Sequence, residues 1–304
     1  MPADCPPTID PVAAARWAAG PSGAASPWLH EEVARRMAER LSWIRLKPQR
    51  WAHWEAVRGG LQAQAELARR YPQAECFVVE GSAGRARQAA AALARPWWHP
   101  ARWQGAALHV QAPPEGGVQM VWANMLLHQV AEPQALMAAW HRALAVDGFL
   151  MFSCLGPDTL RELRPLYQSL GWPEPAHEFT DMHDWGDMLV QAGFAEPVMD
   201  QERITLSFET PERLLQELRE LGRNLHIGRF AGLRGRRWRE QLLAAMARGL
   251  ARAEDGGRLS LSFEVIYGHA LKPAPRLKLQ AQSAITLDDM RSALRQHKKN
   301  PPAV

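Results

Sequence analysis

The sequence predicts an α/β protein built on a mostly parallel sheet. The clearest evidence lies in residues 118–155, where VQMVWAN and FLMFSCLG have the pattern of buried strands on either side of a helix that begins at Pro133. Two strands joined through a helix by short links form a right-handed βαβ unit, in which the strands are parallel. Two later segments, 198–208 and 258–267, alternate apolar and polar residues, which is typical of half-buried strands at an antiparallel edge.

Length and composition are those of a soluble globular protein with one large domain. The chain has 304 residues, of which 47% are hydrophobic and 22% charged. It lacks the run of roughly 18 apolar residues that a membrane span needs, and its first residues do not resemble a signal peptide. The three cysteines, Cys5, Cys76 and Cys154, match no zinc-binding spacing. We therefore expect a monomeric cytoplasmic protein that binds no metal and no membrane.

The positive charge is unevenly distributed along the chain. The formal net charge is only +4, yet arginines crowd into the segment from Arg219 to Arg239. A basic patch of this kind steers an acidic partner, which can be a nucleic acid, a membrane surface or an acidic carrier protein. The same arginines equally suit the solvated face of a helix. We do not expect nucleic acid to be the partner.

The first half of the chain alternates helix and strand patterns after an irregular start. Residues 1–27 are rich in Ala, Pro, Gly and Ser without a period, so we expect a flexible arm. A domain then extends over residues 28–274, and a C-terminal tail follows at 275–304. The elements expected before residue 118 are a helix from Trp28 with Val33, Met37 and Leu41 on one face, a strand at 50–57, a helix containing Leu67 and Tyr71, a strand at 75–82, a helix at 85–94, and an ambiguous segment at 97–117.

The second half adds helices between the strands of the sheet. We expect these helical insertions near residues 156–180 and 210–250. The expected helices span residues 156–170, 183–194 and 236–250, and Gly193 ends the second of them. Another helix is expected to begin at Thr210-Pro211, with Thr210 as the cap and Pro211 in the first turn.

Polar residues follow the strands of the βαβ unit at the place where a ligand would bind. In open parallel sheets, ligands bind beyond the carboxyl ends of the strands. Asn124 ends the first strand of the unit, and the loop 153–158 follows the second. Asp181 and Asp184 suggest helix capping rather than metal binding, because no further ligands cluster with them.

Three segments resemble the malonyl carrier-protein O-methyltransferases of biotin synthesis, a family of class I S-adenosylmethionine-dependent methyltransferases. They are FSCLGPDTLRELR, FTDMHDWGDMLVQAGFAEPVMDQERITLSFE and FEVIYGHALKP. The resemblance covers about residues 28–274 and is dense only after Val118. It implies a Rossmann-like, seven-stranded, mostly parallel sheet with helical insertions, and S-adenosylmethionine as the cofactor. It also implies a malonyl thioester of acyl-carrier protein or coenzyme A as the substrate.

The resemblance further implies which residues approach the methionine part of the cofactor. In the family, an acid-x-Gly-x-Gly-x-Gly motif forms the turn after the first strand, where glycine permits a positive φ and a close approach of the backbone. This chain keeps the acid as Glu55 and the middle glycine as Gly59, followed by Gly60. Val57 and Leu61 replace the outer glycines, and a β-branched valine is costly wherever φ must be positive.

A second acid is implied at the ribose of the cofactor. Glu80 ends the second strand at the expected separation from Glu55, and a carboxylate accepts bonds from two ribose hydroxyls at once. Asn124 matches the polar residue at the end of the fourth strand. The position at which the family contacts adenine falls near Ala107, where this chain has no acid.

On the substrate side, the resemblance implies an arginine that binds the free carboxylate of the malonyl group. Arginine offers a fixed bidentate fork for this purpose, and Arg161 and Arg164, three residues apart on one face, are the candidates. His183 is expected to border the pocket. No residue is expected to act as an acid or base, because the accepting carboxylate is already ionised.

Two functions remain open from the sequence. The first is the methyltransferase. The alternative is a catalytically inactive, methyltransferase-like binding protein that has lost its cofactor, which Val57, Leu61, Ala107 and an N-terminal arm without tyrosine favour. The retained Glu55 and Glu80 favour the enzyme.

Overall fold

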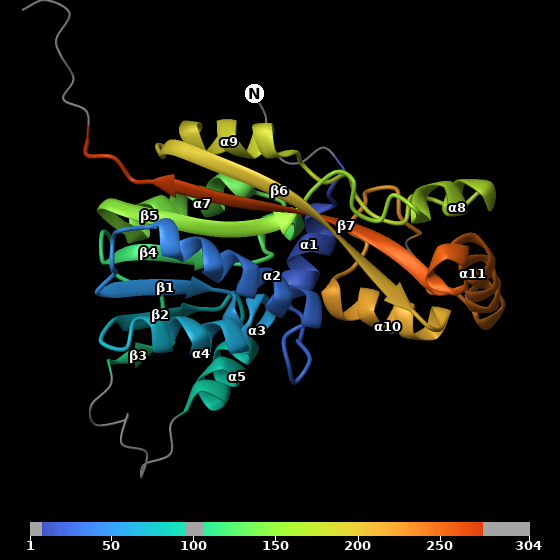
Figure 1. Ribbon diagram of the computed structural model, residues 1–304, viewed down its shortest axis with the longest axis horizontal. Coiled ribbons are helices and arrows are strands. Elements are labelled where there is room, and N and C mark those ends of the chain that lie inside the picture. The colour runs from blue at the N-terminus through green and yellow to red at the C-terminus, as the bar shows by residue number, and fades with distance from the viewer. Residues whose placement is uncertain (1–7, 95–105, 231, 276–304) are drawn as a thin grey trace, which may run out of the picture. The chain divides into compact units, whose positions relative to one another are not determined.

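The computed structural model describes residues 8–94, 106–230 and 232–275. Strands from these residues form one sheet in the order β3-β2-β1-β4-β5-β7-β6 (Figure 1). Neighbouring strands are parallel from β3 to β5, whereas β7 is antiparallel to both β5 and β6. The predicted seven-stranded, mostly parallel sheet is therefore confirmed. The strands are β1 (Arg50–Trp54), β2 (Glu75–Val79), β3 (Leu108–His109), β4 (Val118–Ala123), β5 (Leu144–Leu155), β6 (Ala195–Phe208) and β7 (Leu259–Leu271).

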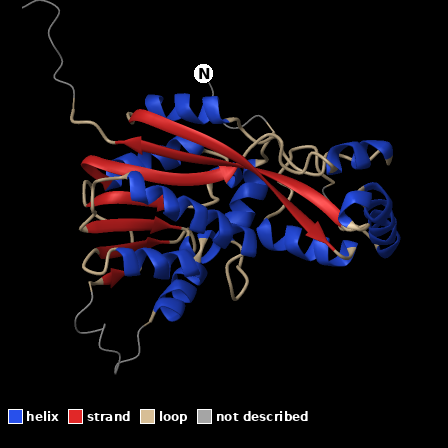
Figure 2. Cartoon of the chain, in the orientation of Figure 1, coloured by secondary structure: helices blue, strands red, loops and turns tan. Residues whose placement is uncertain are grey.

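Helices cover both faces of the sheet, because successive residues of a strand point to opposite sides. In β4, Met120 and Trp122 pack on one face, and Val121 and Ala123 pack on the other. Helices α2, α4 and α5 contribute to the first core and α7 and α9 to the second, and Figure 2 shows the helices around the strands. The elements are α2 (Trp28–Arg40), η1 (Leu41–Trp43), α3 (Ala56–Gly59), α4 (Leu61–Arg70), α5 (Ala83–Leu93), η2 (Leu127–Gln129), α7 (Pro133–Ala143), α9 (Met182–Gln191) and η3 (Ala253–Asp255).

The βαβ unit predicted at residues 118–155 is present, with an earlier helix end than expected. Strands β4 and β5 are parallel neighbours, and α7 begins at Pro133 as predicted. The helix ends at Ala143 rather than at Asp147, and β5 starts with the next residue. Asp147 has a φ of 63°, and its N–H donates to the Lys272 carbonyl oxygen at 2.8 Å. The turn at Asp147 is thus fixed by the segment after β7.

The inserted helices lie together near one end of β6 and β7 (Figure 1). They are α8 (Leu163–Ser169), α10 (Pro211–Leu221) and α11 (Arg236–Gly249). The cap predicted for α10 is confirmed, since Thr210 Oγ1 accepts the Arg213 N–H at 3.2 Å. The helix expected from residue 156 begins only at Leu163. Its first residues form a turn instead, because Thr159 Oγ1 donates to the Glu264 carbonyl oxygen and accepts the Glu264 N–H, both at 3.1 Å.

The segment expected to be a flexible arm contains helix α1 (Pro11–Ala19). Asp10 caps it by accepting the Val12 N–H at 2.8 Å, and the Asp10 carboxylate pairs with Arg229 at 2.6 Å. A helix this short is marginal alone. Contacts with the loop after α10, including a bridge between Ile9 and His226, stabilise it, and composition alone does not reveal them.

From residue 276 onward, the expected C-terminal tail at 275–304 lies outside the described residues. Residues 95–105, which include the start of the ambiguous segment 97–117, also lie outside them. Cys76 and Cys154 are buried free thiols in β2 and β5. Within the described ranges, no helix is both long and apolar enough to cross a membrane.

Candidate functional site

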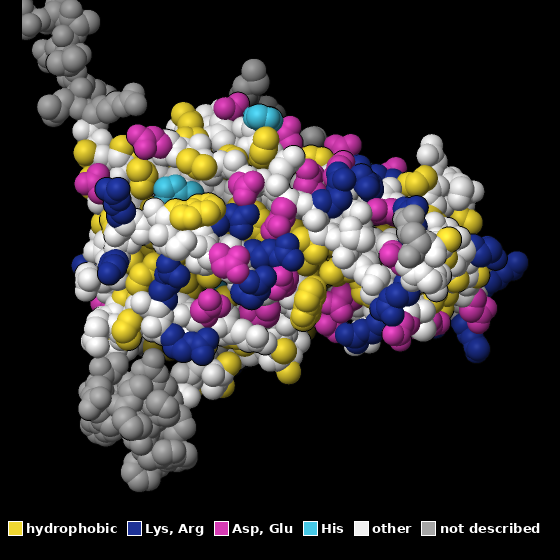
Figure 3. All heavy atoms as spheres, viewed as in Figure 1, with side chains coloured by type: hydrophobic (Ala, Val, Ile, Leu, Met, Phe, Trp, Pro, Cys, Tyr) yellow, Lys and Arg dark blue, Asp and Glu magenta, His cyan; other side chains and the backbone are white. Residues whose placement is uncertain are grey.

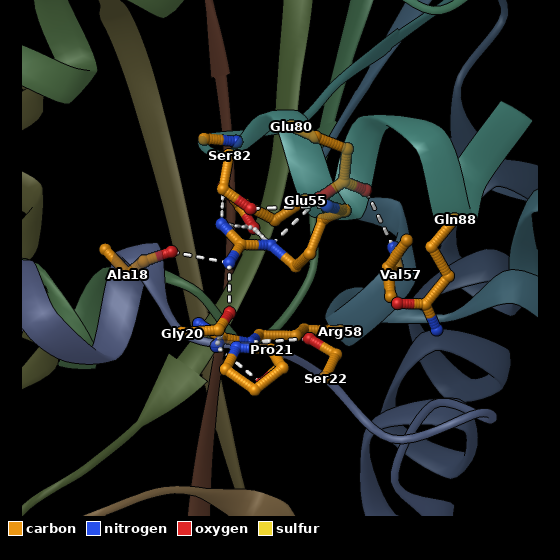
Figure 4. Close-up of polar contacts among 12 residues, drawn as sticks. Ala18, Gly20, Pro21, Ser22, Glu55, Val57, Arg58, Glu80, Ser82 and Gln88 are labelled. Carbon is orange, nitrogen blue, oxygen red and sulfur yellow. Dashed lines mark hydrogen bonds and ion pairs between the residues drawn. The ribbon is translucent and has the colours of Figure 1, made fainter.

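The carboxyl ends of β1 and β2 bring two acids to one arginine. Glu55 follows β1, Glu80 follows β2, and Arg85 lies in the first turn of α5. Arg85 Nε lies 2.9 Å from Glu55 Oε2 and 3.2 Å from Glu80 Oε2 (Figure 4). Arg85 is only 1% exposed, and the Glu80 side chain is fully buried. These three residues, named the acid–arginine triad below, form a buried ion-pair network.

Burial also shifts the pKa of Glu80 within the acid–arginine triad. Loss of water, reinforced by the neighbouring Glu55 charge, raises the pKa of Glu80 to about 7. The 2.9 Å bond that Glu80 Oε1 accepts from the Val57 N–H opposes this rise, as does the charge of Arg85. Both oxygens of Glu80 are therefore in use, and the group titrates near neutral pH.

The N-terminal arm closes over the triad. Arg85 Nη1 donates to the carbonyl oxygens of Ala18 and Gly20, at 3.0 Å for Gly20, and Figure 4 shows both residues beside the triad. Arg58 of α3 donates to the Trp17 carbonyl oxygen at 2.8 Å, and its guanidinium lies 3.9 Å from the centre of the Trp17 ring. Two arginines thus hold the arm against the acids at the carboxyl edge of the sheet.

The turn after β1 favours glycine at position 60 for its backbone conformation and at position 59 because space there is tight. Gly60 has a φ of 139°, and a Cβ on Gly59 would lie 3.0 Å from the Asn124 carbonyl oxygen. The other positive φ in this turn, 57°, belongs to Glu55. Val57 lies inside α3, so the expected cost of a β-branched residue at that position does not arise.

Side chains of the protein itself accept hydrogen bonds from the free N–H groups at the start of α4. Free N–H groups at a helix N-terminus attract anions. Here Ser26 Oγ accepts the Leu61 N–H at 2.9 Å, while the Glu31 carboxylate accepts the N–H groups of Gln62 and Ala63 at 3.0 and 3.1 Å. Leu61, at the position of a family glycine, is simply the first residue of this helix.

Asn124 lies at the end of β4 as expected, but its amide supports the turn. Nδ2 donates to the His30 carbonyl oxygen at 2.8 Å and to that of Gly59, and Oδ1 accepts the Ser153 hydroxyl at 2.6 Å. Asn124 is 1% exposed. In this conformation, both the nitrogen and the oxygen of the Asn124 amide are therefore hydrogen-bonded within the chain.

Ala107 lies away from this site. Its carbonyl oxygen accepts the Cys76 N–H at 2.9 Å, which places it at the amino end of the parallel pair β2–β3. The acids lie at the opposite, carboxyl end. The missing acid at Ala107 therefore has no bearing on the site, and Val110 and Gln111 follow β3 at the relevant end.

A hollow of about 50 Å³ remains among these groups, bordered by Trp17, Glu55, Arg85, Asn124 and Gln129 among others. Pockets for drug-sized ligands are on the order of 300–1,000 Å³. The acids and the glycine turn have the chemistry to hold a nucleoside cofactor, but this conformation leaves it no room. A second hollow of about 300 Å³ adjoins the arm at residues 21–27, so displacement of the arm would supply the space.

A separate cavity of about 130 Å³ lies on the other side of Gln129. Its walls are mostly apolar and come from β5, β7, α8 and α10, with Leu155, Leu218 and Phe263 among them. The polar side chains bordering it are His128, Gln129, Tyr167, His177, Arg223 and Asn224. Two spaces, one bordered by Glu55 and two arginines and one largely apolar, therefore both border Gln129 at the carboxyl edge of the sheet.

The structure does not bring the predicted substrate residues to either space. Arg161 and Arg164 are exposed: Arg161 pairs with Asp158 at 3.7 Å, and Arg164 donates to the Pro157 carbonyl oxygen at 2.6 Å. His183 is exposed at the start of α9 and borders a different surface hollow.

Sequence reasoning gave no role to Arg58 and Arg85 and treated Arg223 only as part of the basic segment. Arg58, Arg85 and Arg223 all border the spaces described above. The available signal was position: Arg58 lies within the glycine turn, and Arg85 lies one helical turn after the acid that ends β2. The described residues contain no group of three or more His, Cys, Asp or Glu side chains suited to a metal ion.

Comparison with known sequences links this arrangement to methyltransferases. Residues 58–152 match the family described as "Methyltransferase domain". Two relatives, both named malonyl-[acyl-carrier protein] O-methyltransferase, come from Gallionella capsiferriformans and Laribacter hongkongensis. The first is 38% identical over 271 residues, covering 86% of this chain and 90% of the relative. The second is 37% identical over 280 residues, covering 90% of each.

Comparison with solved structures supports the fold. The YcgJ protein from Bacillus subtilis superposes with a TM-score of 0.50 and 12% identity, covering 79% of this chain and 99% of that protein. At this level of identity the similarity concerns the fold alone.

Proposed function

Because the chain belongs to the malonyl-[acyl-carrier protein] O-methyltransferase family, we propose that it methylates the free carboxylate of a malonyl thioester on acyl-carrier protein, a step of biotin synthesis, with S-adenosylmethionine as the methyl donor. The observation that carries this proposal is Glu80, a buried acid at the carboxyl end of β2, facing the glycine turn after β1. The two free, buried cysteines of the described chain suit a reducing compartment such as the cytoplasm.

Glu80 and the glycine turn are the groups that would hold the donor. When bound, S-adenosylmethionine supplies a methyl group on a positively charged sulfur. The Glu80 carboxylate would accept the ribose hydroxyls, and Gly59 and Gly60 would let the backbone approach the methionine part. Glu55 borders the same hollow. Ribose hydroxyls and Arg85 compete for the oxygens of Glu80, so binding requires Arg85 and the arm at Ala18–Gly20 to move.

The chain needs no acid–base residue for this reaction. An ionised carboxylate is itself the nucleophile, and the bond that forms to its oxygen replaces the bond from the methyl carbon to sulfur. The protein contributes alignment and exclusion of water. The apolar walls of the 130 Å³ cavity, next to the hollow that Glu55 borders, suit that role.

The arginine-rich segment Arg219–Arg239 is proposed to dock the carrier protein. Arg236, Arg237 and Arg239 are exposed on α11, and basic side chains project in Figure 3 at the end of the view where Figure 1 labels this helix. Leu233, just before the helix, is fully exposed. Basic side chains around an exposed apolar residue match an acidic protein with an apolar contact at its centre.

Mass spectrometry of the acceptor tests the proposed function. The full chain, incubated with S-adenosylmethionine and malonyl-acyl-carrier protein, should add one methylene to the mass of the malonyl group. Acetyl-acyl-carrier protein, which has no free carboxylate, should remain unchanged, and malonyl-coenzyme A shows whether the carrier protein is required. An unmodified malonyl-acyl-carrier protein would refute the proposal and favour a binding protein without catalysis.

A further inference from the structure

Gln129 separates the two spaces in which donor and acceptor would meet. It borders both the hollow that contains Glu55 and Arg85 and the apolar cavity. Trp17 Nε1–H donates to its Oε1, and its own Nε2 donates to the Leu221 carbonyl oxygen at 3.2 Å. An acyl group in the apolar cavity would therefore reach the donor beside Gln129.

Arg223 is the arginine that borders this cavity. Its described hydrogen bonds go only to backbone carbonyl oxygens, those of Arg219 and Gly222, the latter at 2.8 Å. No carboxylate of the described chain forms an ion pair with it. Burial of part of the side chain, with the nearby Arg219 charge, lowers the pKa of Arg223, although the residue is exposed on the surface.

Trp17 occupies the place beside Arg223. The Arg223 guanidinium lies 5.1 Å from the centre of the Trp17 ring, and the Arg58 guanidinium lies 3.9 Å from a ring of the same residue. The arm thus offers these two cations the face of an indole in place of an anion. Arg223 is itself exposed, and the movement of the arm that admits the donor also takes the Trp17 ring away from it.

His177 borders the same cavity and carries a hydrogen-bond acceptor without a partner. It is 4% exposed, and its Nε2 lies 2.6 Å from the His128 carbonyl oxygen. A carbonyl oxygen only accepts, so Nε2 carries the hydrogen and Nδ1 is an acceptor. Nδ1 is buried without a partner. A buried acceptor of this kind is costly unless a ligand supplies a donor.

We propose that Arg223 binds the free carboxylate of the acceptor and that His177 Nδ1 accepts an amide N–H from the arm carrying the thioester. The inference rests on the proposed function, because it assumes a malonyl-type acceptor. The pantetheine arm of acyl-carrier protein and coenzyme A contains amide groups, and the apolar walls suit its methylene carbons. Arg161 and Arg164 then have no part in binding the carboxylate.

Calorimetry with two matched ligands tests this assignment. Malonyl-pantetheine and its methyl ester differ only in the free carboxylate, and S-adenosylhomocysteine keeps the donor side filled without a methyl group to transfer. The wild-type chain should bind malonyl-pantetheine roughly tenfold or more tightly than the ester, as for a charge-assisted hydrogen bond. Arg223→Gln should remove that preference, and Arg223→Lys should retain part of it. His177→Phe should weaken both ligands equally.

The outcomes separate this inference from the proposed function. A wild-type chain that methylates malonyl-acyl-carrier protein while Arg223→Gln keeps its preference for the carboxylate would overturn the inference alone. The inference alone would also be overturned if Arg161→Gln or Arg164→Gln lost the preference for the carboxylate while Arg223→Gln kept it. A wild-type chain that neither binds malonyl-pantetheine nor methylates the carrier protein would overturn both. S-adenosylhomocysteine affinity, unchanged in Arg223→Gln, checks that the variant is folded.

Discussion

At the scale of single residues, Arg85 determines how the acids of the site are used. An acid at the end of β2 is expected to bind a ribose, and Glu80 lies at that position. The structure adds that Arg85 pairs with both Glu80 and Glu55 and ties them to the arm through Gly20. The ligand-free site is thus stabilised by the chain's own groups, which the cofactor must replace.

The triad makes a prediction about stability. Arg85→Gln leaves two carboxylates without their cation, and breaking a buried ion pair costs roughly 3–5 kcal/mol. The loss should be largest at pH 8 and smaller at pH 6, because the pKa of Glu80 is about 7 and the neutral acid is cheaper to bury. Urea unfolding at both pH values measures it. Arg87→Gln, on the exposed side of the same helix, is the control; equal stability of the two variants at pH 8 would contradict the account.

The sequence predicted the positions of residues that follow strands, and it missed residues whose contacts depend on a distant partner. Glu80 and Asn124 were placed because they end apolar runs, and Glu55 was placed through the family's glycine motif. Arg85 could not be identified, because its role depends on burial against two distant residues. The same applies to Val57, whose helical φ depends on the turn as a whole.

At the scale of elements, strong periodic patterns predicted the fold, and contacts between segments produced the exceptions. The strands β4 to β7 and the helices α7, α9 and α10 follow from alternation, stripes and caps. Two exceptions arise from long-range contacts: α8 starts late because Thr159 bonds to β7, and α1 forms against the loop after α10. A local sequence pattern does not indicate contacts between segments that are so far apart in the chain.

Helix α11 carries the prediction at this scale. Changing Arg236 and Arg237 to Glu should slow association with malonyl-acyl-carrier protein at low salt, because charged patches act mainly on the rate of encounter. The difference should shrink as ionic strength rises and the Debye length falls to about 8 Å. Stopped-flow fluorescence with a labelled carrier protein measures the rate. The same change at Arg69 and Arg70, exposed at the end of α4, should have no effect; equal rates for the two double variants would argue against α11 as the docking helix.

At the scale of the whole molecule, buried histidines set the response to acid. Burial lowers the pKa of His30 and His53 to about 4, and it lowers that of His128 well below its usual value. These groups stay neutral in the folded chain but take up protons on unfolding below their ordinary pKa of about 6.5. The unfolded state then binds more protons, so the free energy of unfolding falls as the pH decreases through this range.

The expected decrease is large enough to measure. Each such histidine contributes up to about 1.4 kcal/mol per pH unit. Glu80 acts in the opposite direction, because its raised pKa favours the folded state as the pH falls through about 7, and Glu217 also has a raised pKa. The histidines outnumber these two carboxyl groups, because burial lowers the pKa of His141, His177 and His269 as well. Urea unfolding at pH 8, 6.5 and 5 should show stability nearly level at first and then declining. Stability that rises between pH 6.5 and 5 would contradict this expectation.

Isothermal titration of the full chain with S-adenosylmethionine tests the central claim, that the carboxyl edge beside Glu80 binds the methyl donor. The account predicts a dissociation constant in the micromolar range, about −8 kcal/mol. Glu80→Ala should weaken binding by roughly 1.5–3 kcal/mol, as for a lost charge-assisted hydrogen bond. Arg85 keeps Glu55 as a partner in that variant, so its fold should survive and circular dichroism can verify this. No heat at millimolar ligand from a folded chain, or equal affinity in Glu80→Ala, would contradict the claim.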